Sequence, residues 1–222
     1  MIDIVDNVSV GAVEVYKFGL VRKAHTIVAV FEKIPWMNPF KDIHETNWYY
    51  EDIRYVYENG LMIGTHEDIF DPETSLTRAM LVTILWRVAE EPVADQSVVF
   101  SDVSADQWYS NAIAWALKNG IVLGYGDGTF GTSDPITREQ LAAILYRYEQ
   151  YRGGGFKGLW MYRMDFVDLA YVSDWAYEAV AWLNMKNIYV IREEYLAPKE
   201  KATRAEAAAF LHRYDVYLQN SK

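Results

Sequence analysis

Apolar side chains recur along most of the chain at the spacing of one face of an α-helix. Between positions 108 and 117 they stand at 108, 112, 113, 116 and 117, and Asn119-Gly120 then supplies a stop signal. A turn-rich loop follows, and a second helical pattern begins after Thr137, with apolar residues at positions 141, 144, 145 and 148. This stretch therefore predicts a helix, an ordered loop and a second helix.

The same unit occurs three times. Each copy opens with Phe-x-Asp, carries a tryptophan eight or nine residues after the phenylalanine, and has a Thr-Arg pair where the second helix begins. The opening phenylalanines are Phe40, Phe100 and Phe166, the tryptophans are Trp48, Trp108 and Trp175, and the arginines are Arg78, Arg138 and Arg204. Because neither helix can bury its apolar stripe alone, we expect a mainly α fold of three helix-loop-helix repeats, with a shared core and a pseudo-threefold axis.

The expected repeats span residues 37–95, 96–155 and 156–222, with a glycine-rich linker at residues 152–158. Residues 1–36 follow a different pattern. The segments VSVGAVEVYKF and TIVAVFEK are rich in β-branched residues and predict a β-hairpin. Since one hairpin is marginal in water, it either packs on the repeats or is the tail of a β domain located upstream. The second alternative makes this chain part of a longer protein.

The composition of the chain limits the partners and the kinds of site that it can have. Half of the residues are hydrophobic, and 8 Trp, 17 Tyr and 9 Phe indicate a folded protein. A net charge of -10 disfavours nucleic acids and anionic membranes as partners. The chain has no cysteine, which excludes disulfides and thiolate sites. No stretch has the length of a membrane span or signal peptide, so we expect no membrane insertion and any export signal outside this chain.

The Thr-Arg pairs carry the candidate chemistry. Thr137 with Gln140 and Thr203 with Glu206 match a capping box, whereas Met80 breaks the pattern in the first repeat. The arginines are unexplained by capping, because the first turn of a helix favours anions. One interpretation is a structural salt bridge, for example from Arg138 to Glu139 of a neighbouring copy or to Asp127. The other is an anion, such as a carboxylate, held jointly by the guanidinium and the N–H groups of the helix start.

Several other candidate binding residues could instead have structural roles. Trp48, Trp108 and Trp175 could stack on sugar rings, although a tryptophan that opens an apolar stripe is usually a core residue. The dipeptide Asp127-Gly128 is interpreted as a turn, since it lacks the ligand spacing of a calcium loop. The opening aspartates Asp42, Asp102 and Asp168 are interpreted as turn or cap residues. The four histidines show no metal-ligand spacing, and we expect no cofactor, no metal site and no active site.

The second repeat closely resembles an S-layer homology (SLH) module. Residues 100–145 contain the opening F-x-D, the tryptophan, N-G at a helix end, the loop GYGDGTF and T-R-E-Q at the start of the last helix. The first and third repeats resemble the same module, so three tandem modules cover most of the chain. The resemblance implies a pseudo-trimeric helical spindle and a non-catalytic anchor, which binds secondary polymers attached to bacterial peptidoglycan, often through a pyruvate-bearing sugar.

By this resemblance, Arg78, Arg138 and Arg204 would meet the ketal carboxylate in grooves between repeats, with the tryptophans, Asp127 and Gly128 lining the sugar. The expected location is extracellular, at the bacterial cell surface, and the expected state is a monomer. In the first repeat, GTHEDIFDP lacks the tyrosine and the second glycine of the loop, and in the third repeat IREEYLAP lacks the glycines altogether. We therefore expect unequal grooves, the best of which involves the second repeat. A scaffold for self-assembly or protein contacts, with the arginines in internal salt bridges, is the alternative, and a glycan-cleaving enzyme lacks a recognisable site.

Overall fold

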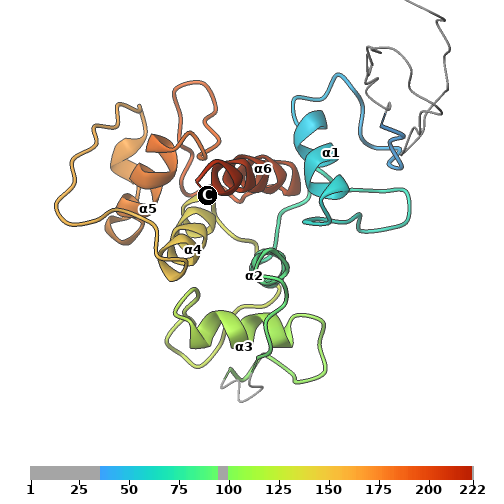
Figure 1. Cartoon of the computed structure of the whole chain (residues 1–222), viewed down its shortest axis with the longest axis horizontal. Helices are drawn as coiled ribbons and strands as arrows, with labels where there is room; N and C mark the ends of the chain where they lie inside the picture. The colour runs from blue at the N-terminus through green and yellow to red at the C-terminus, as the bar shows by residue number, and fades with distance from the viewer. Residues whose placement is uncertain (1–35, 95–99, 222) are drawn as a thin grey trace, which may run out of the picture. The chain divides into compact units, whose positions relative to one another are not determined.

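Two helices per repeat are present, where the apolar patterns place them. The computed structural model describes residues 36–94 and 100–221, and its helices in this part of the chain follow the order of the repeats (Figure 1). The first helices are α1 (Tyr50–Glu58), α3 (Ser110–Lys118) and α5 (Asp174–Met185). The second helices are α2 (Arg78–Val88), α4 (Arg138–Tyr151) and α6 (Arg204–Asn220). A 3-10 turn, Leu169–Tyr171, precedes α5.

The helix starts are set by threonine caps. Thr137 and Thr203 each accept a hydrogen bond from the amide of the third helical residue, and the side chains of Gln140 and Glu206 return the bond to the cap amide. Thr77 accepts the first bond but receives none in return. The two predicted capping boxes and the three predicted helix starts are therefore confirmed.

Glycine or asparagine ends each first helix. Gly60 and Gly120 follow α1 and α3 in the left-handed region, at φ 67° and 69°, and Asn187 takes the same place after α5 at φ 57°. This conformation turns the chain so that the next apolar pair, such as Leu61 and Met62, enters the core. The predicted stop signals are confirmed.

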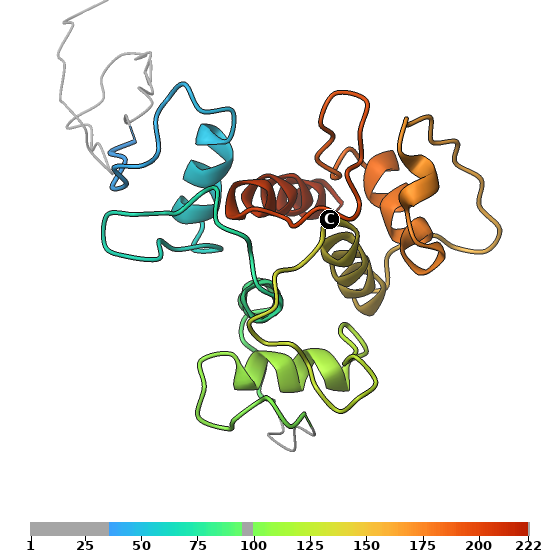
Figure 2. The same cartoon turned by 180° about the vertical axis from the view of Figure 1, so that it is seen from behind.

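Helices pair between repeats rather than within them. Contacts join α2 to α3, α4 to α5 and α1 to α6, so each first helix packs on the second helix of another repeat. In both views α2, α4 and α6 lie inside, and α1, α3 and α5 lie outside (Figures 1 and 2). Ile53 on α1, Ile113 on α3 and Ala176 on α5 are fully buried in one hydrophobic core. The predicted mainly α fold and the shared core are confirmed.

Backbone hydrogen bonds close a ring through the segments before the second helices. The Leu76 amide donates to Ala202, the Ala202 amide donates to Ile136, and the Ile136 amide donates to Leu76, at 2.8 to 2.9 Å. Each repeat contributes one residue to this ring. The ring supports the pseudo-threefold axis, which stays a prediction together with the repeat boundaries. The predicted hairpin lies outside the described residues.

The opening aspartates hold the long loops. Asp102 accepts hydrogen bonds from the amides of Phe130, Gly131 and Thr132, at 2.7, 2.7 and 3.3 Å. Asp42 and Asp168 accept equivalent pairs of amide bonds from residues 70–71 and 196–197. These carboxylates fix the loop that passes beside the next helix start, which fits their interpretation as turn residues.

Candidate functional site

Each arginine of a Thr-Arg pair crosses into another repeat. The Nε of Arg78 donates to the Phe130 carbonyl at 2.9 Å, and its Nη2 donates to the Leu123 carbonyl at 3.0 Å. Arg204 makes the equivalent bonds to Phe70 and Ile63, at 2.9 and 2.7 Å. These side chains are only 6% and 5% exposed. The first role of the arginine is therefore to bind carbonyls of the neighbouring loop.

Neighbouring carbonyls also occupy the helix-start amides. The first two amides of α2, from Arg78 and Ala79, donate to the carbonyls of Asp134 and Thr132. The corresponding amides of α4 and α6 donate to residues 200 and 198, and to residues 74 and 72. The third amide of each helix is bound by the cap threonine. The prediction that these N–H groups help to hold an anion is wrong, because loop carbonyls already satisfy them.

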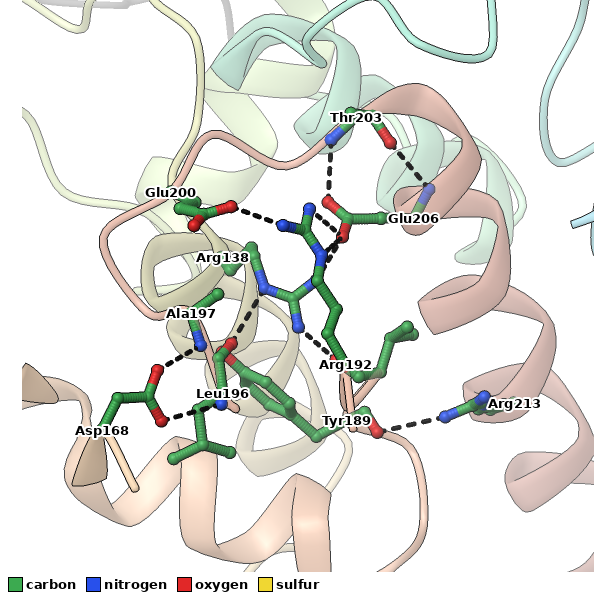
Figure 3. A network of polar contacts seen from close by, with 11 residues as sticks. Arg138, Asp168, Tyr189, Arg192, Leu196, Ala197, Glu200, Thr203, Glu206 and Arg213 are labelled. Atoms are coloured by element: carbon green, nitrogen blue, oxygen red, sulfur yellow. Dashed lines mark hydrogen bonds and ion pairs between the residues drawn. The ribbon is translucent and has the colours of Figure 1, made fainter. Parts of the chain in front are cut away.

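Arg138 differs from the other two arginines by having a carboxylate partner (Figure 3). Its Nη1 lies 2.6 Å from Glu206 Oε1, its Nε donates to Leu196 O at 2.9 Å, and its Nη2 donates to Val190 O. The arginine is 0% exposed. The salt-bridge interpretation thus holds for Arg138, but its partner is Glu206.

Arg192 completes this network. Its Nε donates to Glu206 Oε1 at 2.7 Å, and it also forms an ion pair with Glu200 (Figure 3). Partial burial acts to lower the pKa of Arg192, but the two carboxylates outweigh burial and raise it. Two arginines and two glutamates are therefore paired beside the start of α6.

The two acids proposed as partners of Arg138 lie elsewhere. Glu139 forms an ion pair with Lys199 at 2.6 Å and accepts bonds from Ser173. Asp127 accepts two bonds from Thr129, at 2.9 and 2.6 Å, within its own exposed loop. These bonds form a local turn, as the Asp127-Gly128 dipeptide predicts, and neither residue lines the two grooves described below.

Arg78 and Arg204 form no ion pair within the described residues. Burial lowers the pKa of both guanidinium groups. Because an arginine stays protonated at neutral pH even so, each site keeps a positive charge, and its guanidinium donates hydrogen bonds to neutral carbonyls. Nearby aspartates oppose part of the effect of burial on the pKa, namely Asp134 and Asp102 at Arg78 and Asp71 and Asp42 at Arg204. These two positions can attract an anion.

The three tryptophans are exposed. Trp48, Trp108 and Trp175 have exposed fractions of 60%, 56% and 53%, and all three stand just before or at the start of a first helix. The expectation that they are core residues is wrong. Helices α1 and α3 each begin two residues after the tryptophan, at Tyr50 and Ser110, so Trp48 and Trp108 are not part of the buried helical stripe. Their indole faces are available for stacking.

One groove brings a tryptophan, two arginines and apolar groups together. It has a volume of about 320 Å³, and we call it the Arg204 groove. Its lining includes Ile63, Met80, Ile84, Arg87, Trp108 and Arg204. All three repeats contribute, so the groove exists only in the assembled fold. An anionic group on a sugar could contact the arginines while the ring lies against the indole.

A second groove of about 380 Å³ lies at the equivalent place on α6, and we call it the Glu206 groove. Its lining includes Trp48, Glu73, Val190, Arg192, Thr203 and Glu206. A tryptophan, Trp48, is again present. The charged residues of this groove are Arg192 and Glu206, which are paired with each other, and the exposed Glu73. The two grooves therefore have similar volumes and each includes an exposed tryptophan, but they differ in charge.

Arg87, Arg192 and Glu206 were not among the predicted site residues. A signal for Arg87 existed, because Arg87, Arg147 and Arg213 each stand nine residues after the arginine of a Thr-Arg pair. Arg147 lies close enough to Arg78 for the positive charge to act, with burial, to lower the pKa of Arg147. The sequence predicts only the capping role of Glu206, because it does not indicate the ion pair with Arg138 of another repeat.

Residues 36–94 and 100–221 contain no cluster of three or more His, Asp or Glu side chains that could hold a metal ion. In the same residues, no helix combines the length and hydropathy needed to cross a bilayer.

Comparison with known families gives a match in the first two repeats. The family model described as S-layer homology domain matches residues 39–79 and 99–142. These ranges contain the Thr-Arg pairs at Arg78 and Arg138, and they end at the second residue of α2 and the fifth residue of α4. The third repeat resembles the second in having a capping box and an opening aspartate, Asp168, that accepts hydrogen bonds from loop amides.

Relatives include surface proteins and enzymes. The chain is 30% identical to "S-layer protein sap" of Bacillus anthracis over 79% of this chain and 21% of that protein. It is 29% identical to a "Cellulosome-anchoring protein" of Acetivibrio thermocellus, over 64% of this chain and 31% of that protein. It is 34% identical to an "Amylopullulanase" of Thermoanaerobacterium thermosulfurigenes, over 83% of this chain and 10% of that protein. The chain thus spans about a third or less of the length of each of these relatives.

Proposed function

The chain belongs to the S-layer homology domain family, and from this premise we propose that it is a non-catalytic module that anchors a protein to the bacterial cell wall. The family match and the S-layer relatives indicate a location at the cell surface. The names of the S-layer and cellulosome-anchoring relatives support an anchoring role. The relatives named as enzymes match over a small share of their length, which agrees with a module appended to many kinds of protein.

The proposed ligand is a secondary cell wall polymer linked to peptidoglycan, with a pyruvate ketal on one of its sugars. The observation that carries this proposal is the Arg204 groove. Arg204 and Arg87 supply positive charge for the ketal carboxylate, and the half-exposed Trp108 offers an indole face to the sugar ring. Met80 and Ile84 line the same groove and suit the ketal methyl group.

Of the other predicted site residues, Arg78 stays in the proposal, with Trp175 as its expected tryptophan. Arg78 keeps an unpaired charge and lies near Arg147. Trp48 lines the Glu206 groove, and Arg138 is buried behind it, where its guanidinium is bound by Glu206. Two functional grooves on one rigid body would anchor strongly even if each were weak, because a polymer repeats its epitope.

The test is co-sedimentation of the full chain with purified cell-wall sacculi, before and after acid removal of the secondary polymer. We expect the intact sacculi to retain the protein and the stripped sacculi to lose it. Trp108→Ala should weaken retention, whereas Leu159→Ser, at a fully exposed residue outside both grooves, should not. Retention that survives acid stripping would contradict the proposed ligand.

The alternative function is a scaffold for self-assembly or protein contacts without glycan binding. The observation that favours it is the set of carbonyl bonds made by Arg78, Arg138 and Arg204, since these arginines stabilise the fold without any ligand. Sedimentation equilibrium separates the two functions. A monomer that binds intact sacculi supports the anchor, and a self-associating chain that ignores sacculi supports the scaffold.

A further inference from the structure

We infer that the segment between α4 and α5 is an edge strand that pairs with the same segment of a second copy of this chain. The segment is residues 160–167, WMYRMDFV, and we call it the linker strand. It follows the glycine-rich residues 152–158 that separate the second and third repeats. The inference goes beyond the proposed function and does not depend on it, because it concerns a contact between protein molecules and not a ligand.

The side chains of the linker strand alternate between the protein and solvent. The partly or fully buried positions are Trp160, Tyr162, Met164 and Phe166. The exposed positions are Met161, Arg163, Asp165 and Val167. A period of two is that of an extended strand, and the backbone makes no turn or bend between residues 160 and 166.

The inner face of the strand is fixed on the third repeat. Trp160 stacks on Phe156, with ring centroids 4.1 Å apart and an interplanar angle of 6°. The Tyr162 hydroxyl donates to Asn184 Oδ1 on α5 at 2.6 Å. Met164 is buried. These contacts hold the backbone in an extended form before any partner arrives, which reduces the entropy lost on pairing.

The backbone of the strand lacks a partner of its own. Within the described part of the chain, no backbone–backbone hydrogen bond involves the amides or carbonyls of residues 160–165. In both views this segment lies at the outer edge of the third repeat, beyond α5 (Figures 1 and 2). Unpaired N–H and C=O groups on an exposed, extended segment are a template for another strand.

The exposed side chains select a second copy as that strand. In an antiparallel pair centred on Met164, Arg163 of each copy stands opposite Asp165 of the other, so two ion pairs form. In the same register Met161, which is 98% exposed, stands opposite Val167, which is 62% exposed. The adjacent registers, centred on Arg163 or on Asp165, place like charges opposite each other, which is unfavourable. One register is therefore complementary in both charge and hydropathy.

The charges of the strand are available for this contact. Arg163 and Asp165 lie 3.6 Å apart within one chain, but their side chains are 88% and 89% exposed. Such an exposed pair contributes little to stability, so it can be exchanged for the pairs between copies. Because the strand is short and each chain carries a net charge of -10, we expect a weak and reversible dimer.

The first experiment is sedimentation velocity of the full chain from micromolar to millimolar concentration, where the unmodified chain should form dimers. Arg163→Asp and Asp165→Arg each place like charges opposite each other and should raise the dissociation constant roughly tenfold or more. An equimolar mixture of the two variants should recover the dimer, because each introduced charge then meets its opposite. Lys41→Asp makes the same charge change at a residue whose side chain is 76% exposed in the first repeat, and should leave association unchanged.

The second experiment tests the register by disulfide formation. The chain has no cysteine, so introduced thiols have no competitor. A mixture of Met161→Cys and Val167→Cys chains should form a disulfide-linked dimer on mild oxidation, because these positions stand opposite each other between copies. Either variant alone should form few dimers, since identical positions lie several residues apart in this register.

The outcomes decide the inference without touching the anchor. A chain that stays monomeric at millimolar concentration would overturn it, and so would a dimer that Arg163→Asp leaves unchanged. A mixture of the charge variants that associates no better than either variant alone would also contradict it. Circular dichroism checks that the variants fold, as expected for side chains so exposed. Retention by sacculi is measured separately, so a failed anchor and a failed dimer are distinguishable.

Discussion

An arginine at the first position of a helix is unfavourable for the helix alone, because its charge lies at the positive end of the helix dipole. The structure shows what offsets this cost. Arg78, Arg138 and Arg204 extend away from their helices and donate to carbonyls in another repeat. The tertiary contact therefore explains why an arginine stands at this position in all three repeats.

The first prediction concerns the buried pair. Arg138→Met should lower the free energy of unfolding by about 3 kcal/mol, because it removes two carbonyl bonds and one partner of the buried Glu206. Urea denaturation followed by circular dichroism measures this loss. Arg163→Met is the matched control, since the Arg163–Asp165 pair is 88% and 89% exposed, and it should leave the midpoint unchanged. Equal midpoints for the two variants would contradict the structural role of Arg138.

The second prediction concerns acid stability. Burial acts to raise the pKa of Asp102, but the amide bonds from Phe130, Gly131 and Thr132 outweigh it and lower the pKa. A lowered pKa means that the carboxylate stabilises the fold above the unfolded pKa of about 3.9, and that this stabilisation disappears as the pH falls below that value. Asp102→Asn should therefore lower the urea midpoint at pH 7, and the difference from the unmodified chain should shrink at pH 2.5. A difference that is constant with pH would contradict this origin.

The sequence predicts best those contacts that a side chain makes with its own helix. The threonine caps and the two capping boxes could be predicted because their partners, such as Thr137 and Gln140, are only three residues apart. Contacts with a residue that is distant in the chain could not be predicted. The acceptors of Arg78 are backbone carbonyls such as that of Leu123. Because every residue has such a carbonyl, the sequence does not indicate which one accepts the bond. The exposure of Trp108 was also missed, since periodicity does not show that the helix begins only at Ser110.

At the scale of elements, the apolar stripes predicted six helices but not their partners. The stripe on α1 requires a cover, yet nothing in its period identifies α6, which lies more than 140 residues further along the chain. The pairing is completed by polar contacts. His212 lies 2.7 Å from Asp52, and Tyr55 donates to Asp215 at 2.7 Å. These contacts fix which face of α6 meets α1.

The third prediction concerns the start of α4. Thr137→Ala should lower the free energy of unfolding by about 1 kcal/mol, because the Gln140 amide loses its side-chain acceptor. Thr137→Ser keeps the hydroxyl oxygen and should retain most of the stability. Thermal unfolding by circular dichroism measures both variants. A loss of equal size in Thr137→Ser would assign the effect to the missing methyl group instead of the cap.

At the scale of the whole molecule, the pairing of α1 with α6 makes this protein different from an open array of repeats. In an open array each repeat contacts only its sequence neighbours, and the ends can unfold first. Here the first helix covers the last one, and Leu76, Ile136 and Ala202 close a ring of hydrogen bonds. The repeats between residues 36 and 221 are therefore expected to unfold together.

The last prediction tests this cooperativity with Ile53→Ala on α1, where the side chain is fully buried. The cavity should lower the free energy of unfolding by roughly 2–5 kcal/mol. Because α1 and α6 share one core, the loss should shift a single transition, and tryptophan fluorescence and far-UV circular dichroism should report the same midpoint. Glu51→Ala, at an exposed residue of the same helix, should leave that midpoint in place. If Ile53→Ala instead splits the transition in two, the first repeat unfolds alone, and the contact between α1 and α6 is too weak to hold the repeats together.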